Sequence, residues 1–255
     1  MHLVICGLED SVSRLLLSLV ILGLFVSCTR GPETNLNWTS QGVLPPAPDS
    51  VKVKTNIKFQ TTQGNMKEKG SVDAFIYAIP NKKYRIELKG PLGVQVASIL
   101  WLETNWQVYI PSEKIVFQGQ GQAIQLPIPG FKDLSIHQLV SSLWGEVFPI
   151  GWQKASHTQS GETTFLKWSC DSKDCISTID KQSGRVNSLQ IDSTLWKYQN
   201  WTKQQNFKYP THIEVIDLNQ QLQIDVEEID LQPSWNSRLW KLRFPPSTKI
   251  RDIAQ

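Results

Sequence analysis

The sequence predicts a mainly β domain, in which an antiparallel meander of strands curls into a barrel or a sandwich. The first observation is a series of segments in which apolar and polar residues alternate, the pattern of strands with one face in water. The second is that short turn clusters separate these segments. The third is that only residues 134–144 have helical spacing instead. Many strands joined by short turns are typical of antiparallel barrels and sandwiches.

The amino end predicts a signal peptide. Residues 15–26 are almost uninterruptedly apolar, with Arg14 just before them and Ser27 and Cys28 just after. A run of about 12 residues is too short to cross a hydrocarbon core, which needs roughly 20. We therefore expect residues 1–27 to be removed, and not to remain as a membrane span.

The end of this segment, Leu24 to Cys28, resembles the lipobox of bacterial lipoproteins, although Phe25 stands where the family usually has Leu. The resemblance implies that Cys28 becomes the first residue of the mature chain and carries lipid. Two or three acyl chains hold a protein stably on a membrane. Thr29, in place of the Asp that retains enteric lipoproteins in the inner membrane, favours the outer membrane facing the periplasm. The alternative is an ordinary secretory signal with a chance cysteine.

Residues 28–50 are expected to form a tether. They are rich in Gly, Pro, Asn and Ser, cannot bury much apolar surface, and stiffen where prolines cluster near residue 45. The formal net charge of the whole chain, +3, is too small to indicate nucleic acid as a partner. Ten Trp residues indicate a large apolar interior or an aromatic surface for a greasy or planar ligand.

Strands are predicted wherever period-two alternation occurs. Turns are expected around residues 80–82, 111–113, 181–184 and 219–221. The apolar members of the predicted strands are Val51/Val53/Thr55/Ile57/Phe59, Tyr84/Ile86/Leu88, Trp106/Val108/Ile110, Thr164/Leu166/Trp168, Leu189/Ile191, Leu222/Ile224/Val226 and Trp240/Leu242/Phe244.

Residues 134–144 predict one amphipathic helix with an N-cap serine and an end near Gly145. Such a helix must lie against the sheet or close its mouth. Its apolar residues fall at i, i+3, i+4, i+7 and i+8: Ile136, Leu139, Val140, Leu143 and Trp144.

Two cysteines remain after the signal segment and Cys28 are set aside. Cys170 and Cys175 flank four polar residues between two strand-like segments. In an oxidising compartment this arrangement predicts a disulfide at a hairpin tip. The alternative, a redox pair, normally uses the tighter spacing Cys-x-x-Cys at the start of a helix.

Several segments together resemble the LolA/LolB-type family of periplasmic lipoprotein-sorting proteins. They are Pro80 to Ile86, Gly90-Pro-Leu-Gly93, Trp106 to Pro111 with Ile115 to Phe117, Gly184 to Asp192, Tyr209 to Glu214, Leu222 to Ile229, and Phe244-Pro-Pro246. The resemblance implies an unclosed antiparallel β-barrel with a helical lid over residues 51–250, whose concave face holds acyl chains. The chain departs from the family in leaving little room for a long helix before residue 51. The leucine-bearing loop by which the LolB type enters its membrane is not located by the sequence.

The resemblance also suggests a site. Packing is the default for inward apolar residues, but the family implies a cavity lined by Tyr84, Ile86, Leu88, Trp101, Trp106, Val108, Leu139, Leu143 and Trp144. The family has an arginine here that latches the lid, which makes Arg85 a possible lid latch. By alternation alone, Arg85 is a residue of the wet face.

Catalytic and metal sites find no support in the sequence. His137, His157 and His212 are far apart and fit no ligand spacing, so we expect them to face solvent. Asp225, Glu227 and Glu228 could form a carboxylate cluster, but Asp225 and Glu227 are interpreted as sharing the solvated face of a strand, opposite Ile224 and Val226.

The resulting hypothesis is a monomeric, membrane-anchored carrier or acceptor of lipoprotein or lipid acyl chains in outer-membrane sorting. It needs no cofactor or metal, is not an enzyme, and takes a periplasmic carrier protein as a possible partner. The alternative is a structural or scaffold lipoprotein of the cell envelope with a filled barrel.

Overall fold

The computed structural model describes residues 48–63, 66–121, 136–145, 153–170, 173–218 and 220–253. The predicted signal peptide, the predicted lipidation site Cys28 and most of the predicted tether lie outside these residues. No helix among the described residues is long and apolar enough to cross a membrane.

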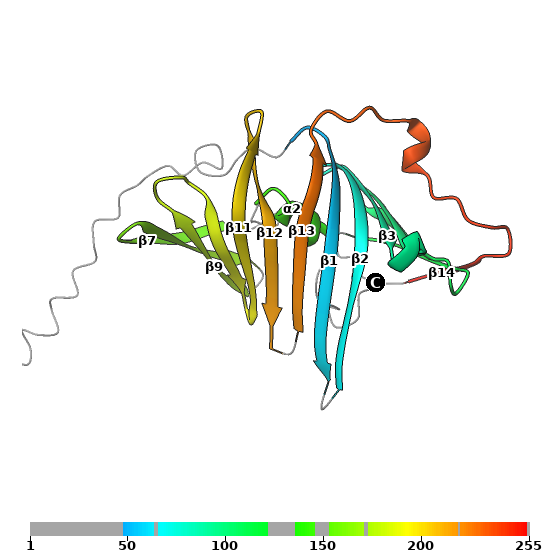
Figure 1. Cartoon of the computed structure of the whole chain (residues 1–255), viewed down its shortest axis with the longest axis horizontal. Coiled ribbons are helices and arrows are strands. Elements are labelled where there is room, and N and C mark those ends of the chain that lie inside the picture. Colours follow the sequence, from blue (N-terminus) through cyan, green and yellow to red (C-terminus); the bar gives the residue numbers. More distant parts are fainter. Residues whose placement is uncertain are drawn as a thin grey trace, which may run out of the picture. The chain divides into compact units, whose positions relative to one another are not determined.

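One sheet of 14 strands makes up the domain (Figure 1). Its order is β14-β6-β5-β4-β3-β2-β1-β13-β12-β11-β10-β9-β8-β7, so β14 and β7 are its two edges. The elements are β1 Val51–Gln63, β2 Met66–Ile79, β3 Lys83–Lys89, η1 Pro91–Gly93, β4 Gln95–Leu102, β5 Asn105–Ile110, β6 Ile115–Gln120, α2 Ile136–Ser142, β7 Gln153–Ser160, β8 Thr163–Cys170, β9 Lys173–Asp180, β10 Val186–Ile191, β11 Thr194–Gln204, β12 Phe207–Asp217, β13 Gln220–Asp230, η2 Ser237–Trp240 and β14 Lys249–Asp252.

The sheet consists of two meanders, β1 to β6 and β7 to β13, joined side by side. The joint is the antiparallel pair β1–β13, in which Ile57 lies opposite Ile224. The edge strands β7 and β14 are not paired with each other, so the sheet is open, as expected. One pair departs from the predicted antiparallel pattern, because the short strand β14 runs parallel to β6.

Alternation along the strands separates an inner from an outer face. In β1, Val51, Val53 and Ile57 are fully buried, whereas Lys52 and Lys54 lie on the opposite face. The buried residues of both meanders and of α2 form one continuous apolar cluster on the inner face. The period-two pattern therefore predicted the inner face of these strands correctly.

The predicted strand at Trp240, Leu242 and Phe244 is wrong. Trp240 ends the 3-10 helix η2, and residues 241–246 form neither helix nor strand. Residues 241–245 still alternate between exposed and half-buried side chains, because this stretch lies against the outer face of β3 to β5 without pairing to a strand.

Candidate functional site

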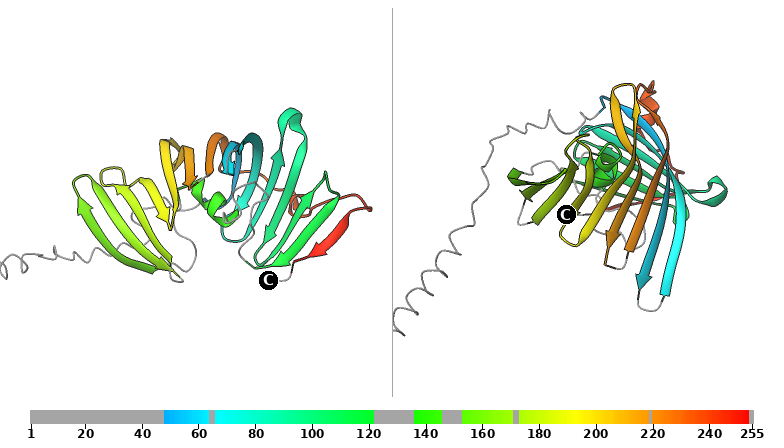
Figure 2. Two further views of the ribbon diagram at one scale, coloured as in Figure 1. Left: turned by 90° about the horizontal axis from the view of Figure 1, so that it is seen from below. Right: turned by 60° about the vertical axis from the view of Figure 1, so that its left-hand side comes forward.

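Helix α2 lies within the curve of the sheet, against its inner face (Figure 2). The five predicted apolar residues are all buried: Ile136, Leu139, Val140, Leu143 and Trp144. The helix itself has only seven residues. Isolated helices shorter than about 12 residues are marginal in water, so α2 depends on this packing for its stability.

The structure brings the nine predicted cavity residues together between α2 and strands β3 to β5. Tyr84 lies opposite Trp101 across β3 and β4, and Trp101 lies opposite Trp106 across β4 and β5. None of the nine is more than 6% exposed, and all belong to the same apolar cluster. In this conformation they are covered by protein atoms, so an acyl chain can reach them only if α2 moves.

Contacts near both ends tie α2 to the sheet. Near its amino end, His137 Nδ1 lies 3.0 Å from the hydroxyl of Tyr84 on β3. At its carboxyl end, Gly145 has φ +70°, and a Cβ at this position would collide with the indole of Trp201 on β11. Glycine is required there for both reasons. The helix therefore bridges the two meanders of the sheet.

The prediction that His137 faces solvent is wrong. Its ring is half-buried and lies against the rings of Tyr84 and Trp101, with centroids 5.8 and 6.4 Å away. Helical spacing places His137 at the flank of the apolar stripe, and the curved sheet reaches round far enough to cover that flank. The side chain of His157 lies outside the described residues.

The burial of His137 predicts a dependence on pH. Burial lowers the pKa of His137 below its ordinary value of 6.5. A group whose pKa is lower in the folded state gives its full stability above the unfolded pKa and loses it as pH falls through the folded one. We therefore expect α2 to open more readily at about pH 5 than at about pH 7.5. Hydrogen–deuterium exchange of residues 136–142, corrected for the intrinsic rate, measures this opening.

The matched variant is His137→Asn, whose side chain does not titrate in this range. It is expected to make the corrected exchange of residues 136–142 nearly independent of pH. A pH dependence that persists in this variant would show that another group controls the helix.

Arg85 lies on the other face of the sheet from α2 and bonds to a C-terminal segment there. Its Nη1 donates to the carbonyl oxygens of Leu239 at 2.6 Å and Lys241 at 3.1 Å, and its Nε donates to Glu87 at 2.6 Å. Both acceptor carbonyls belong to residues 231–248, here called the C-terminal strap. The lid-latch role at α2 stays a prediction; in the structure these bonds join Arg85 to the strap, and its side chain is 19% exposed.

Aromatic contacts hold the C-terminal strap along its length. Trp235 lies edge-on to Tyr77 and to Trp240, with centroid distances of 6.0 and 5.7 Å. The ammonium of Lys83 lies 4.4 Å from the centre of the Trp240 ring. The alternation of apolar and polar residues from Trp240 to Phe244 indicates that one side of this segment is covered. It does not indicate which part of the protein covers it.

A polar cluster on the outer face was missed by the sequence reasoning. His212 Nδ1 lies 2.6 Å from Asp225, which also accepts from Lys58 at 2.9 Å. Burial opposes ionisation of Asp225, but these hydrogen bonds together hold the pKa of its carboxyl below the ordinary value. In the β12–β13 ladder His212 lies opposite Asp225, whereas a turn at the predicted residues 219–221 would have placed it opposite Glu228, so the sequence did not indicate this pair. The cluster fits the predicted solvated strand face, although His212 is half-buried.

The predicted disulfide is not confirmed. Cys175 is a buried free cysteine whose pKa burial raises to about 12, while the side chain of Cys170 lies outside the described residues. In the β8–β9 ladder, Cys170 lies opposite Lys173 and Cys175 lies opposite Trp168. The two cysteines thus occupy diagonal positions, roughly 7–8 Å apart, beyond the usual reach of a disulfide.

Solved structures with a similar fold identify the architecture. A LolA superfamily protein from Nitrosomonas europaea aligns with a TM-score of 0.56 and 13% identity, over 78% of this chain and 93% of its own. This chain has the LolA-type fold. A DUF1329 family protein from Desulfovibrio piger shares the LolA-type fold with a TM-score of 0.54 and 10% identity, over 77% of this chain and 91% of its own.

A third similar structure, from Vibrio parahaemolyticus, is described as an outer membrane lipoprotein-sorting protein domain. It aligns with a TM-score of 0.53 and 8% identity, over 77% of this chain and 91% of its own. No family model and no curated protein matches the chain. The likeness is therefore one of backbone architecture, and it confirms the open, mainly antiparallel sheet that the family resemblance implies. In the residues described here, α2 is the α-helix that packs against the inner face of the sheet.

Proposed function

We propose that this protein is a lipoprotein, anchored through Cys28, that binds acyl chains of lipoproteins or lipids between α2 and the inner face of its sheet. It then acts as a carrier or acceptor in outer-membrane sorting. The observation that supports this most is the inner face itself. Six apolar side chains of β3 to β5 meet Leu139, Leu143 and Trp144 there, in and just after a helix of two turns that depends on this packing for its stability.

Exchange of the helix for an acyl chain needs no energy source. A chain that displaces α2 takes over its apolar contacts, at about 25 cal/mol for each Å² removed from water. The closed conformation then protects the apolar face when no cargo is present. The same close packing also favours the second candidate function, a scaffold lipoprotein with a permanently filled interior.

Binding of a fatty acid separates the two functions. The full chain with Cys28→Ser is incubated with palmitate and analysed by native mass spectrometry and by hydrogen–deuterium exchange of residues 136–142. The carrier is expected to retain palmitate and to exchange these amides faster when it is bound, because the helix is displaced. A protein that retains no palmitate and keeps the same exchange pattern is the scaffold.

The turn between β3 and β4 supplies an apolar contact for the membrane. Leu92, at the centre of η1, is fully exposed, and Val94 is 64% exposed. The turn is closed by the amide of Gly90, which donates to the carbonyl of Val94 at 2.8 Å, so Leu92 is held outward on a short, defined turn. Together with Val96, which is 41% exposed, Leu92 and Val94 form a small apolar patch, and contiguous apolar patches are typical of surfaces that meet a membrane or a partner.

Leu92→Glu is expected to weaken binding of the Cys28→Ser protein to phospholipid vesicles by about 10- to 100-fold, the equivalent of burying one leucine. Leu218→Glu is the matched control, because Leu218 is also a highly exposed leucine, in the turn between β12 and β13. Vesicle sedimentation measures both. Equal losses in the two variants would show that the added charge, and not the β3–β4 turn, weakens the binding.

A further inference from the structure

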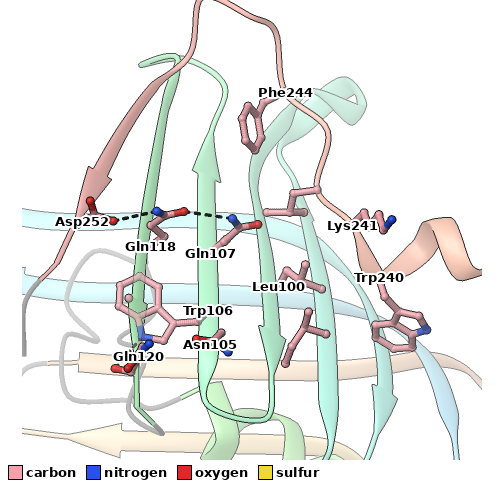
Figure 3. A pocket seen from close by; sticks show the side chains of 13 residues that line it. Leu100, Asn105, Trp106, Gln107, Gln118, Gln120, Trp240, Lys241, Phe244 and Asp252 are labelled. Atoms are coloured by element: carbon pink, nitrogen blue, oxygen red, sulfur yellow. Dashed lines mark hydrogen bonds between the residues drawn. The ribbon is translucent and has the colours of Figure 1, made fainter.

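A groove of about 690 Å³ lies on the outer face of the sheet, between strands β4 to β6 and the C-terminal strap (Figure 3). This volume falls within the range of small-molecule sites, roughly 300–1,000 Å³. The groove, here called the outer groove, shares Trp106 with the predicted acyl site but opens on the other face. Its floor includes Leu100 and Leu102, and its far wall includes Trp240, Leu242 and Phe244 of the strap.

Side-chain amides form two rows across the outer groove. Asn105 lies opposite Gln120 in the β5–β6 ladder, and Gln107 lies opposite Gln118 two residues further along. In the second row, Gln107 donates to Gln118 at 3.3 Å, and Gln118 donates to Asp252 on β14 at 2.8 Å. The rows are separated by roughly 7 Å, twice the rise of a strand residue.

The second row leaves hydrogen-bonding capacity for a ligand. Its bonds use one oxygen of Asp252 and the amide nitrogen of Gln107, so the Oδ2 of Asp252 and the carbonyl oxygen of Gln107 are not used within the row. Amides also donate as well as accept, which suits groups such as hydroxyls that do both.

The apolar wall is fixed in place. Phe244 packs against the ring of Tyr109, with centroids 5.9 Å apart, and Lys83 covers Trp240. Arg85 holds the strap backbone on both sides of Trp240 through Leu239 and Lys241. A wall held by these contacts loses little conformational entropy when a ligand binds.

The chemistry of the outer groove excludes several ligand classes. One cation, Lys241, and one anion, Asp252, line it, so it offers no excess of charge for phosphate or nucleic acid. An acyl chain would remove the two amide rows from water without offering them any hydrogen bond. The backbone of the floor is already paired in ladders, so an added peptide strand finds no main-chain partners on this face.

We propose that the outer groove binds a neutral carbohydrate of about two sugar rings. The apolar faces of the rings pack against Trp240 and Phe244, and their hydroxyls exchange hydrogen bonds with the two amide rows and with Asp252. The proposal does not depend on acyl binding, because the amide rows and the strap wall lie on the outer face.

Isothermal titration of the full lipidated chain in lipid nanodiscs tests this proposal, with cellobiose, maltose and N,N′-diacetylchitobiose as probes. At least one disaccharide is expected to bind saturably, and Gln118→Leu and Asp252→Asn are each expected to weaken it by about ten-fold, the equivalent of one lost hydrogen bond. Gln223→Leu is the matched control, since Gln223 is a half-buried glutamine on β13, outside the groove.

Circular dichroism confirms that each variant is folded before it is titrated. No saturable binding of any of the three disaccharides up to about 10 mM would overturn the proposal. An equal loss of affinity in Gln118→Leu and Gln223→Leu would overturn it as well. Co-sedimentation with insoluble chitin or cellulose then distinguishes a polymeric glycan from a free sugar as the source of the ligand.

Discussion

Arg85→Ala is expected to release the C-terminal strap from the outer face and to lower the free energy of unfolding by about 3 kcal/mol. Arg85 and Glu87 are only 19% and 14% exposed, and Arg85 joins Glu87 to the carbonyls of Leu239 and Lys241. Truncation leaves two carbonyls without their donor and removes the cation next to a largely covered carboxylate. Hydrogen–deuterium exchange should become faster in residues 237–244 and stay unchanged in residues 136–142.

Two further variants make the Arg85 result specific. Arg85→Lys keeps the charge but not the planar fork, so an intermediate loss is expected. Arg238→Ala removes an exposed arginine of the same strap and should change stability by less than about 0.5 kcal/mol. Faster exchange in residues 136–142, with residues 237–244 unchanged, would return Arg85 to the role of a lid latch at α2.

The inner face of the domain was predictable because alternation reports which side chains are covered. The same reasoning failed at Trp240 to Phe244, where the side chains alternate but the backbone has no partner strand. Alternation requires only an extended chain lying on something apolar, and the outer face of β4 and β5 satisfies this with Leu100 and Tyr109. Hydrogen-bond partners are set by tertiary contacts that the local pattern does not contain.

At the candidate site, too, the local sequence pattern predicts which residues are buried but not which distant segments they contact. Helical spacing identified the five residues that α2 buries, but not the contact of His137 with Tyr84, which depends on the curvature of the sheet. Alternation placed Arg85 on the outer face, but the strap that covers it comes from more than 150 residues further along the chain. The pairing of β1 with β13, which joins the two meanders, is equally distant in sequence. Each of these features depends on segments that no local window contains together.

Trp144→Ala is expected to lower the free energy of unfolding by about 3–5 kcal/mol, because a fully enclosed indole is replaced by a cavity. The side chain of Trp144 is 1% exposed. Trp144 directly precedes Gly145, which lies close to the indole of Trp201 in the second meander. Urea unfolding of the Cys28→Ser protein, at an unchanged slope with urea, measures the loss. Trp235→Ala, which removes a half-buried indole of the strap, should cost clearly less. A loss below about 1 kcal/mol for Trp144→Ala would mean that this end of α2 is not packed between the two meanders. The closed state from which acyl binding is proposed to start would then not exist.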